Sequence, residues 1–263
     1  GFYSILVAWE SKGNIPIIAF EPEPRNIRAI KKSMKSNNLT NCITIVESAI
    51  GEIKKKSTLK LCPIGSGGHS LSPTVPEDTT GEINVSVETL DNVYNTFSNL
   101  MNNTLVKIDI EGYEINALKG ASSWLSQKKN APIILIEAWP QSSLYPKKNH
   151  IRTLQILMDY GYKIFAIQEA LHQKTLVIDI NKKNIHYCLP KSGNYIAIPE
   201  WANKVIPDLK KPIDLRLFST KEQLQRVHSF LEKSHHNLKH KIQNLKPETY
   251  VPPKPTFKKR ISY

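Results

Sequence analysis

Residues 106–121 read VKIDIEGYEINALKGA and carry the signals for a strand, a turn and a helix in direct succession. The β-branched run Leu105–Ile110 is typical of a buried strand. After a turn glycine, apolar residues recur at helical spacing from Glu114 onward, and an acid in the first turn complements the helix dipole. Ligands of open α/β sheets bind at the carboxyl ends of strands. We therefore predict that Asp109 and Glu111 lie at the mouth of a site; the alternative is that they are solvated turn residues.

The same rhythm continues on both sides of this stretch. A predicted helix, Phe2–Ser11, is followed by the apolar strand Pro16–Phe20, and a second helix begins at Pro24, where proline suits the first turn. Cys42–Val46 reads as the next strand, and Pro132–Ile136 follows the central helix. Strands and helices at this spacing predict βαβ units with a parallel sheet.

Three of the predicted strands deliver an acid to the following loop: Glu21, Asp109 and Glu137. In a parallel sheet these acids would share one rim. Nucleotide-binding α/β folds place a carboxylate about 20 residues after a glycine-rich turn, where it accepts hydrogen bonds from ribose hydroxyls, and Glu21 stands at that distance from Gly1. The alternative for Glu21 is an exposed loop acid between prolines.

The segment Glu52–Val87 interrupts the rhythm. Thr58–Cys62 and Ile83–Val87 predict short strands, and the long loop between them is of a kind that is more often functional than decorative. It contains the run GSGGHS, which lacks the lysine and the helix of a phosphate loop. His69 in this run is a candidate for substrate contact, and the alternative is a flexible Gly/Ser connection.

Beyond residue 149 the chain predicts a helix, two strands and an irregular hairpin region; the ranges are Arg152–Tyr160, Tyr162–Ile167, Tyr195–Ile198 and Leu176–Cys188. After Trp201 the pattern changes to a proline-punctuated linker, a basic helix around residues 221–241 and an extended run at 252–255. We predict a domain over residues 1–201 and a basic, partly helical extension over 202–263.

Composition bounds the function classes. The 263 residues are 40% hydrophobic and 22% charged, with a mean hydropathy of −0.35, and no apolar run approaches the about 18 residues of a membrane span. No signal peptide is recognisable, so we expect a cytoplasmic protein. Three widely spaced cysteines leave one unpaired and offer no metal spacing, which favours a reducing compartment. The net charge of +13 is concentrated in predicted loops and the extension, which argues against a nucleic-acid groove.

Several short motifs together resemble the FkbM family of S-adenosylmethionine-dependent methyltransferases. The resemblance runs from Gly1 to about Trp201 and is most specific in the central block. The motifs are Glu21-Pro22 after a strand, Ser48-Ala49-Ile50-Gly51 after the next, Thr89-Leu90-Asp91, Lys107 to Glu114 with Leu118-Lys119-Gly120-Ala121, and Ile134 to Glu137.

The resemblance implies a Rossmann-like, class I methyltransferase fold: an α/β sheet, mostly parallel with an antiparallel last strand, and helices on both faces. It implies transfer of a methyl group to the oxygen of a hydroxyl-bearing acceptor such as a sugar, a glycan or a small molecule. The cofactor would be held by residues near the first strand ends, with Glu21 on the ribose and Ser48 and Ala49 on the adenine side. The implied cofactor-binding set is Gly1, Phe2, Ser4, Glu21, Pro22, Ser48, Ala49 and Asp109.

A hydroxyl acceptor is a poor nucleophile, so we expect a base near it. The candidates are Asp109, Glu111 and Glu137, in that order, followed by His69. Asp109 and Glu111 offer oxygen ligands that suit magnesium, but no third ligand is evident and no metal is predicted.

The family's first strand and glycine-rich turn would lie before Gly1, so we expect the natural protein to begin earlier and assign the activity to that parent. Two other readings stay open: a nucleotide-binding α/β enzyme, and an inactive methyltransferase-fold module that binds partners through its basic extension.

Overall fold

The computed structural model describes residues 1–63, 65, 67–73, 79–98, 103–138, 149–170, 174–183, 185 and 193–204. The chain divides into two units, Gly1–Leu215 and Arg216–Tyr263, and every described residue belongs to the first. The basic helix expected around 221–241, the extended run at 252–255 and Cys188 lie outside the described residues. The boundary after residue 201 therefore stays a prediction.

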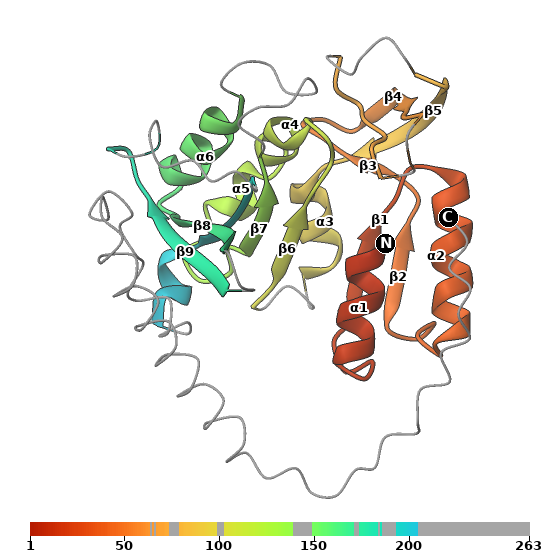
Figure 1. The fold of residues 1–263 in the computed structure, drawn as a ribbon, viewed down its shortest axis with the longest axis horizontal. Coiled ribbons are helices and arrows are strands. Elements are labelled where there is room, and N and C mark those ends of the chain that lie inside the picture. The colour runs from red at the N-terminus through yellow and green to blue at the C-terminus, as the bar shows by residue number, and fades with distance from the viewer. Residues whose placement is uncertain are drawn as a thin grey trace, which may run out of the picture. The chain divides into compact units, whose positions relative to one another are not determined.

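Helices and strands alternate along the described part of the chain (Figure 1). The helices are α1 (Phe2–Glu10), α2 (Pro24–Ser36), α3 (Leu90–Thr96), α4 (Glu114–Lys119), α5 (Ser122–Leu125), α6 (Asn149–Asp159) and the 3-10 helix η2 (Glu200–Lys204). The strands are β1 (Ile17–Phe20), β2 (Ile43–Val46), β3 (Ala49–Ile50), β4 (Lys55–Leu61), β5 (Gly81–Glu88), β6 (Leu105–Ile108), β7 (Ile133–Glu137), β8 (Lys163–Ala170), β9 (Lys174–Ile180) and β10 (Asn194–Ile198).

These strands form three sheets, ordered β1-β2, β3-β5-β4 and β6-β7-β10-β8-β9. The pairs β1–β2 and β6–β7 are parallel, and each is joined through helices, as the predicted βαβ units require. Strand β10 lies between β7 and β8 and runs antiparallel to both. The α/β class and the antiparallel last strand are therefore found.

The expectation of one mostly parallel sheet is wrong for the described residues. Strands β4 and β5 pair antiparallel, and so do β8 and β9. Three residues, 171–173, separate β8 from β9, which is too few for the crossover of about a dozen or more residues that parallel pairing needs. The region expected to be irregular after residue 176 contains β9, which pairs with β8 from Ile180 back to Lys174.

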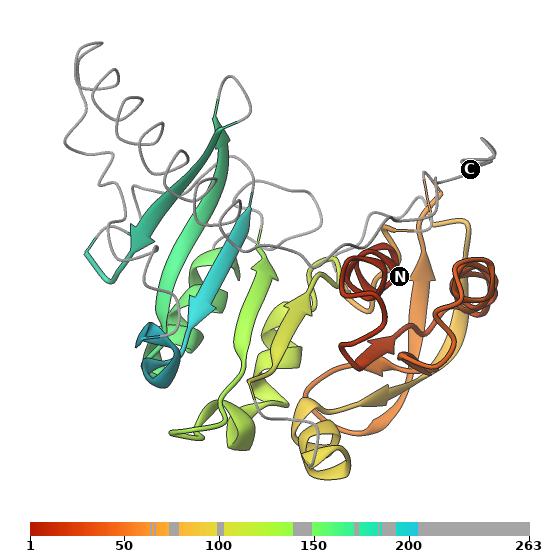
Figure 2. The same cartoon turned by 90° about the horizontal axis from the view of Figure 1, so that it is seen from below.

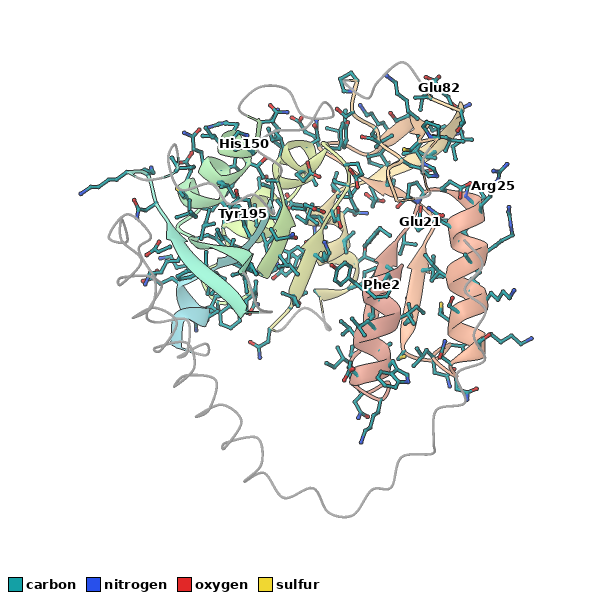
Figure 3. All side chains as sticks on the ribbon, in the orientation of Figure 1. Phe2, Glu21, Arg25, Glu82, His150 and Tyr195 are labelled. Carbon is teal, nitrogen blue, oxygen red and sulfur yellow. The ribbon has the colours of Figure 1, made fainter. Side chains whose placement is uncertain are left out.

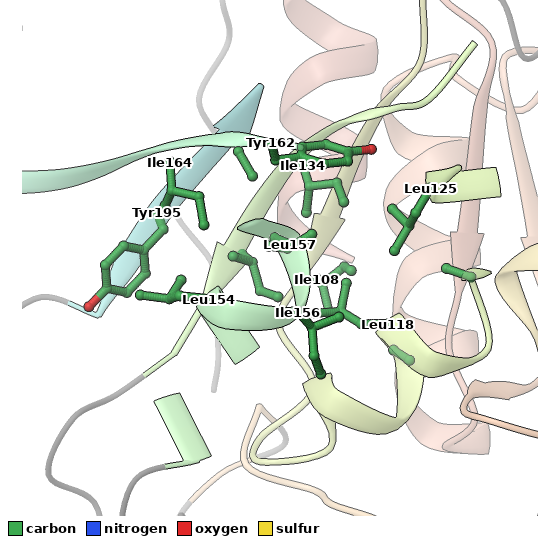
Figure 4. Close-up of a cluster of buried hydrophobic side chains, with 14 of the residues drawn as sticks. Ile108, Leu118, Leu125, Ile134, Leu154, Ile156, Leu157, Tyr162, Ile164 and Tyr195 are labelled. Atoms are coloured by element: carbon green, nitrogen blue, oxygen red, sulfur yellow. The ribbon is translucent and has the colours of Figure 1, made fainter. Parts of the chain in front are cut away.

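The largest core lies against one face of the five-stranded sheet (Figure 4). Ile134 and Ile164 from the strands meet Leu118 of α4 and Leu154 and Leu157 of α6, all of them at most 1% exposed. The alternate strand residues face the other way, where η2 packs on them. Helical elements therefore cover both faces of this sheet.

A separate cluster holds α1 and α2 on the β1–β2 pair (Figure 2). Helix α2 begins where the sequence predicts, because the side chain of Glu23 accepts a hydrogen bond from the backbone N–H of Asn26 at 2.6 Å and Pro24 fills the first turn. Its apolar face buries Ile30 and Met34. Within the described ranges, no helix is long and apolar enough to cross a bilayer.

Two contacts fix α4 and α5 against the three-stranded sheet and α3. A Cβ added at Gly120 would overlap the backbone carbonyl oxygen of Gly51, so the two chain segments meet only because Gly120 has no side chain. Asp91 accepts hydrogen bonds from the backbone N–H groups of Ser123 at 3.0 Å and Trp124 at 2.8 Å, which caps α5. The Thr89–Asp91 motif therefore has a structural task.

Candidate functional site

One cavity of about 600 Å³ collects most of the predicted site residues. It is walled by the N-terminal end of α1, a face of α2, the ends of β1 and β6, the loop after β2 and the segment after β4. The predicted residues that line it are Gly1, Phe2, Glu21, Pro22, Ser48, Ala49, His69, Asp109 and Glu111. Ser4 and Glu137 are not among the lining residues.

Glu21 follows β1 directly and lies beside the N-terminal end of α2, which carries Arg25 (Figure 3). One of its carboxylate oxygens, Oε1, accepts the backbone N–H of Glu23 at 3.0 Å. Its own N–H donates to the carbonyl of Val46 at 3.1 Å. The side chain is thus oriented by the bond from Glu23, the backbone is held by β2, and the remaining lone pairs of the carboxylate can accept hydrogen bonds from a ligand.

Ser48 lines this cavity and has a buried hydroxyl. The residue is 6% exposed, and its Oγ has no hydrogen-bond partner in the part of the chain that the structure describes. A buried hydroxyl without a partner costs about 1–3 kcal/mol. A ligand that offers a donor or an acceptor at this point would remove that cost.

Asp109 lies where β6 ends, next to Glu137 at the end of β7, because the parallel register places Ile108 opposite Ile136. Lys107 binds the Asp109 carboxylate at 2.8 Å, and its ammonium group lies 4.5 Å from the ring centroid of Tyr3. Burial would raise the pKa of Asp109, but hydrogen bonds with Glu137 and Lys107 outweigh it and lower that pKa. The lowered pKa favours the anionic form of the Asp109 carboxyl.

Glu111 adopts a left-handed backbone, with φ of 52°, and Gly112 follows at 92°. For a residue with a side chain this conformation costs about 1–3 kcal/mol. Burial raises the pKa of the Glu111 carboxyl, and the negative charge of Asp109 raises it further, while Lys107 opposes them. The two cavity acids of this turn are therefore driven apart in proton affinity.

Two buried side chains hold the strained turn. Glu114, 2% exposed, accepts the backbone N–H groups of Ile110 and Gly112 through Oε1, each at 3.2 Å. Ser70, 1% exposed, donates its hydroxyl to the carbonyl of Glu111 at 2.6 Å. The second bond comes from the segment after β4 and closes that segment over the acidic turn.

His69 lines the cavity with a defined protonation pattern. Its Nδ1 accepts the backbone N–H of Cys62 at 3.0 Å, so Nδ1 carries no proton. The neutral imidazole must then carry its proton on Nε2, which makes Nε2 a donor and not a base. Cys62 and Cys42 are free thiols.

Among the described residues, no group of three or more His, Cys, Asp and Glu side chains is arranged to hold a metal ion. The groups that the cavity offers are an anionic carboxylate, a second carboxyl with a raised pKa, an imidazole N–H and a hydroxyl without a partner. Together they can bind hydroxyl groups, stabilise a nearby positive charge and accept a proton.

The sequence reasoning missed the contribution of α2. Asn26, Ala29 and Ser33 line the cavity, and Leu59 and Leu71 add apolar surface from β4 and the segment after it. Small and polar residues at i, i+3 and i+7, beside the apolar stripe of the helix, are a signal that could have identified this face. The contribution of Leu71 depends on a loop and has no such signal.

A structure of "Methyltransferase FkbM from Methylobacillus flagellatus KT" is similar at 19% identity with a TM-score of 0.45, over 75% of this chain and 40% of that chain. The chain thus spans about two fifths of the length of that solved protein. No curated protein matches. The family model described as the methyltransferase FkbM domain matches residues 2–164, and the chain therefore belongs to this family.

Proposed function

We propose that the protein is an S-adenosylmethionine-dependent O-methyltransferase that acts on a hydroxyl of a sugar, a glycan or a small molecule. Membership of the family implies methyl transfer. The observation that carries the finer proposal is the meeting of Glu21, Ser48, Asp109 and Glu111 in one cavity. Its volume of about 600 Å³ lies within the range of small-molecule sites, about 300–1,000 Å³.

The residues at the β1 end fit the cofactor. Glu21 has lone pairs for ribose hydroxyls, and the hydroxyl of Ser48 lacks a partner within the described part of the chain. Phe20 and Ile30 add apolar wall, and the N-terminal end of α1 brings backbone N–H groups and the positive end of a helix dipole. We assign Glu21 to the ribose, Ser48 and Ala49 to the adenine side, and Gly1 and Phe2 to the amino-acid part.

S-adenosylmethionine supplies an electrophilic methyl group when it is bound. We assign Asp109 to the sulfonium side, because its lowered pKa keeps the carboxylate anionic beside a positive charge. Glu111 is the better base of the two, because its pKa is raised toward the working range of a proton acceptor. Its carboxylate takes the proton of the acceptor hydroxyl. Glu137 is a positioning residue for Asp109, and His69 donates its Nε2–H to an acceptor oxygen.

The test is calorimetric titration of S-adenosylhomocysteine into the natural full-length protein and two variants. We expect binding by the unchanged protein, and weakening by tenfold or more, about 1.4 kcal/mol, in Glu21→Ala. Glu47→Ala is the matched control: it removes an acid from the end of β2 that is 57% exposed and bound to Lys31, and it should leave the affinity unchanged. A folded protein that does not bind S-adenosylhomocysteine would contradict the proposal and favour the inactive binding module.

A further inference from the structure

The peptide unit between Glu111 and Gly112 is held at both of its polar ends. Its carbonyl accepts the Ser70 hydroxyl at 2.6 Å, and its N–H donates to Glu114 Oε1 at 3.2 Å. Glu111 and Gly112 both have positive φ values. A peptide unit next to a glycine can rotate with little steric resistance, so these two bonds decide its orientation.

Ser70 is itself fixed before it reaches Glu111. Its backbone forms an isolated two-way bridge to Lys60 on β4, with the N–H donating at 3.1 Å and the carbonyl accepting at 2.9 Å. The backbone N–H of Ser72 donates to the Ser70 hydroxyl oxygen at 2.9 Å. Because that bond occupies a lone pair, it directs the hydroxyl hydrogen toward the Glu111 carbonyl.

We propose that Ser70 is a positioning residue for the Glu111 carboxylate: its hydroxyl and the Glu114 carboxylate together lock the Glu111–Gly112 peptide and thereby keep the acid turned into the cavity. The same residue ties the cavity wall formed by His69 and Leu71 to the acidic turn, since it lies between them in the chain. One side chain therefore links this wall to the turn that carries Glu111. The proposal rests on the assignment of Glu111 as the base.

The test needs no methyl acceptor. In Ser70→Ala, the Glu111 carbonyl loses its buried donor, so the peptide can turn and the carboxylate can swing toward solvent, away from Asp109. NMR of carboxyl-labelled protein, with the Glu111 signal assigned from Glu111→Gln, should show the raised pKa falling toward that of an ordinary glutamate. Exchange of the Gly112 amide hydrogen should become about tenfold faster.

Ser72→Ala is the control matched for burial, because Ser72 is 2% exposed and keeps its backbone N–H bond to Ser70. It should leave the Glu111 pKa and the Gly112 exchange rate unchanged. Should Ser70→Ala fail to fold, Ser70→Cys keeps the volume with a weaker donor and should shift both readouts in the same direction, by less.

Unchanged readouts in a folded Ser70→Ala protein would overturn the proposal. S-adenosylhomocysteine binding distinguishes this failure from that of the proposed function. Ser70→Ala should bind within twofold of the unchanged protein, because Glu21 and Ser48 keep their places. Absence of S-adenosylhomocysteine binding by the unchanged protein would overturn the proposed function, but it would not contradict the role of Ser70 in fixing the Glu111–Gly112 peptide.

Discussion

The turns after β1 and β6 both hold an acidic side chain in the cavity, but different contacts support them. Each places an acid in the cavity and follows it with a buried acid that accepts backbone N–H groups: Glu23 after Glu21, and Glu114 after Asp109 and Glu111. After β1, the side-chain bonds that orient the turn are local, and prolines restrict the backbone. After β6, the backbone is left-handed at Glu111 and depends on a serine 41 residues away in sequence.

This difference indicates which of the two turns is less sensitive to substitutions elsewhere in the protein. The acidic side chains at the β1 end are oriented by neighbours in sequence, and the backbone N–H of Glu21 is bound to the carbonyl of Val46 on β2. The β6 end stores strain and needs a completed tertiary structure to hold it. Four experiments test this contrast.

The largest expected effect separates the two buried acids. Glu114→Ala leaves the N–H groups of Ile110 and Gly112 without an acceptor in a buried turn, and should lower the free energy of unfolding by about 3 kcal/mol. Glu23→Ala removes a helix cap and should lower it by about 1 kcal/mol. Urea denaturation measures both. Equal losses would show that the two turns depend equally on their buried acids.

The second prediction concerns Ser48 beside the β1 end. Ser48→Ala should weaken S-adenosylhomocysteine binding about fivefold, or about 1 kcal/mol, because the ligand loses a hydrogen bond. Without ligand the variant should be at least as stable as the unchanged protein. It removes a buried hydroxyl that has no hydrogen-bond partner among the residues that the structure describes. Ser36→Ala, on an exposed position of α2, is the control for both measurements. Equal affinity in calorimetry would remove Ser48 from the cofactor site.

The third prediction uses the lowered pKa of Asp109. A carboxyl whose pKa is lower in the folded state stabilises the fold above its unfolded pKa, and that stability is lost as the pH falls through the folded pKa. Asp109→Asn should therefore lower the free energy of unfolding by about 1 kcal/mol at pH 7, and the difference should shrink as the solution is acidified. Thermal unfolding over a pH series measures it. Asp159→Asn, which breaks an exposed pair with Lys182, should cost less than about 0.5 kcal/mol.

The smallest effect has the opposite sign. The pKa of Glu111 is raised in the folded state, so its contribution is fully present below the unfolded pKa and is lost as the pH rises through the folded pKa. Glu111→Gln should therefore be more stable than the unchanged protein at pH 7, by about 0.5 kcal/mol after allowance for solvent screening, and equal to it below the unfolded pKa. The same thermal series measures it. A loss of stability at pH 7 would contradict the desolvation and charge repulsion assigned to the Glu111 carboxylate.

Much of the secondary structure around the ends of β1 and β6 could be predicted from sequence, because it depends on residues that are neighbours in the chain. Strand, acid and helix signals around Glu21 and Asp109 follow from periodicity, glycine and proline, and both residues line the cavity. Glu137 was expected at the same rim. It lies beside Asp109, but it is not among the residues that line the cavity.

Other parts could not be predicted because they depend on contacts between distant segments. The hydrogen bond from Ser70 to Glu111 joins a loop without a periodic hydrophobic pattern to a distant turn, and no residue spacing in the sequence predicts this contact. The left-handed backbone of Glu111 has no sequence signal of its own, since such conformations are found chiefly at glycine and asparagine. The alternation of the first strands with helices predicts a mostly parallel sheet, but β4 pairs antiparallel with β5, and β8 pairs antiparallel with β9.

The close approach of Gly120 to the carbonyl of Gly51 has a consequence for how this protein can vary. A Cβ at Gly51 would in turn lie 2.8 Å from Val87 Cγ1 and 3.1 Å from Tyr113 Cε1. A side chain at either glycine therefore requires a compensating change elsewhere, at Val87 or Tyr113 in one case and in the backbone itself in the other. Under random mutagenesis and selection, variants with a replacement at Gly51 should recover function through second-site changes. Gly120 should accept no replacement, because the obstacle there is the backbone carbonyl oxygen of Gly51, which no side-chain substitution removes.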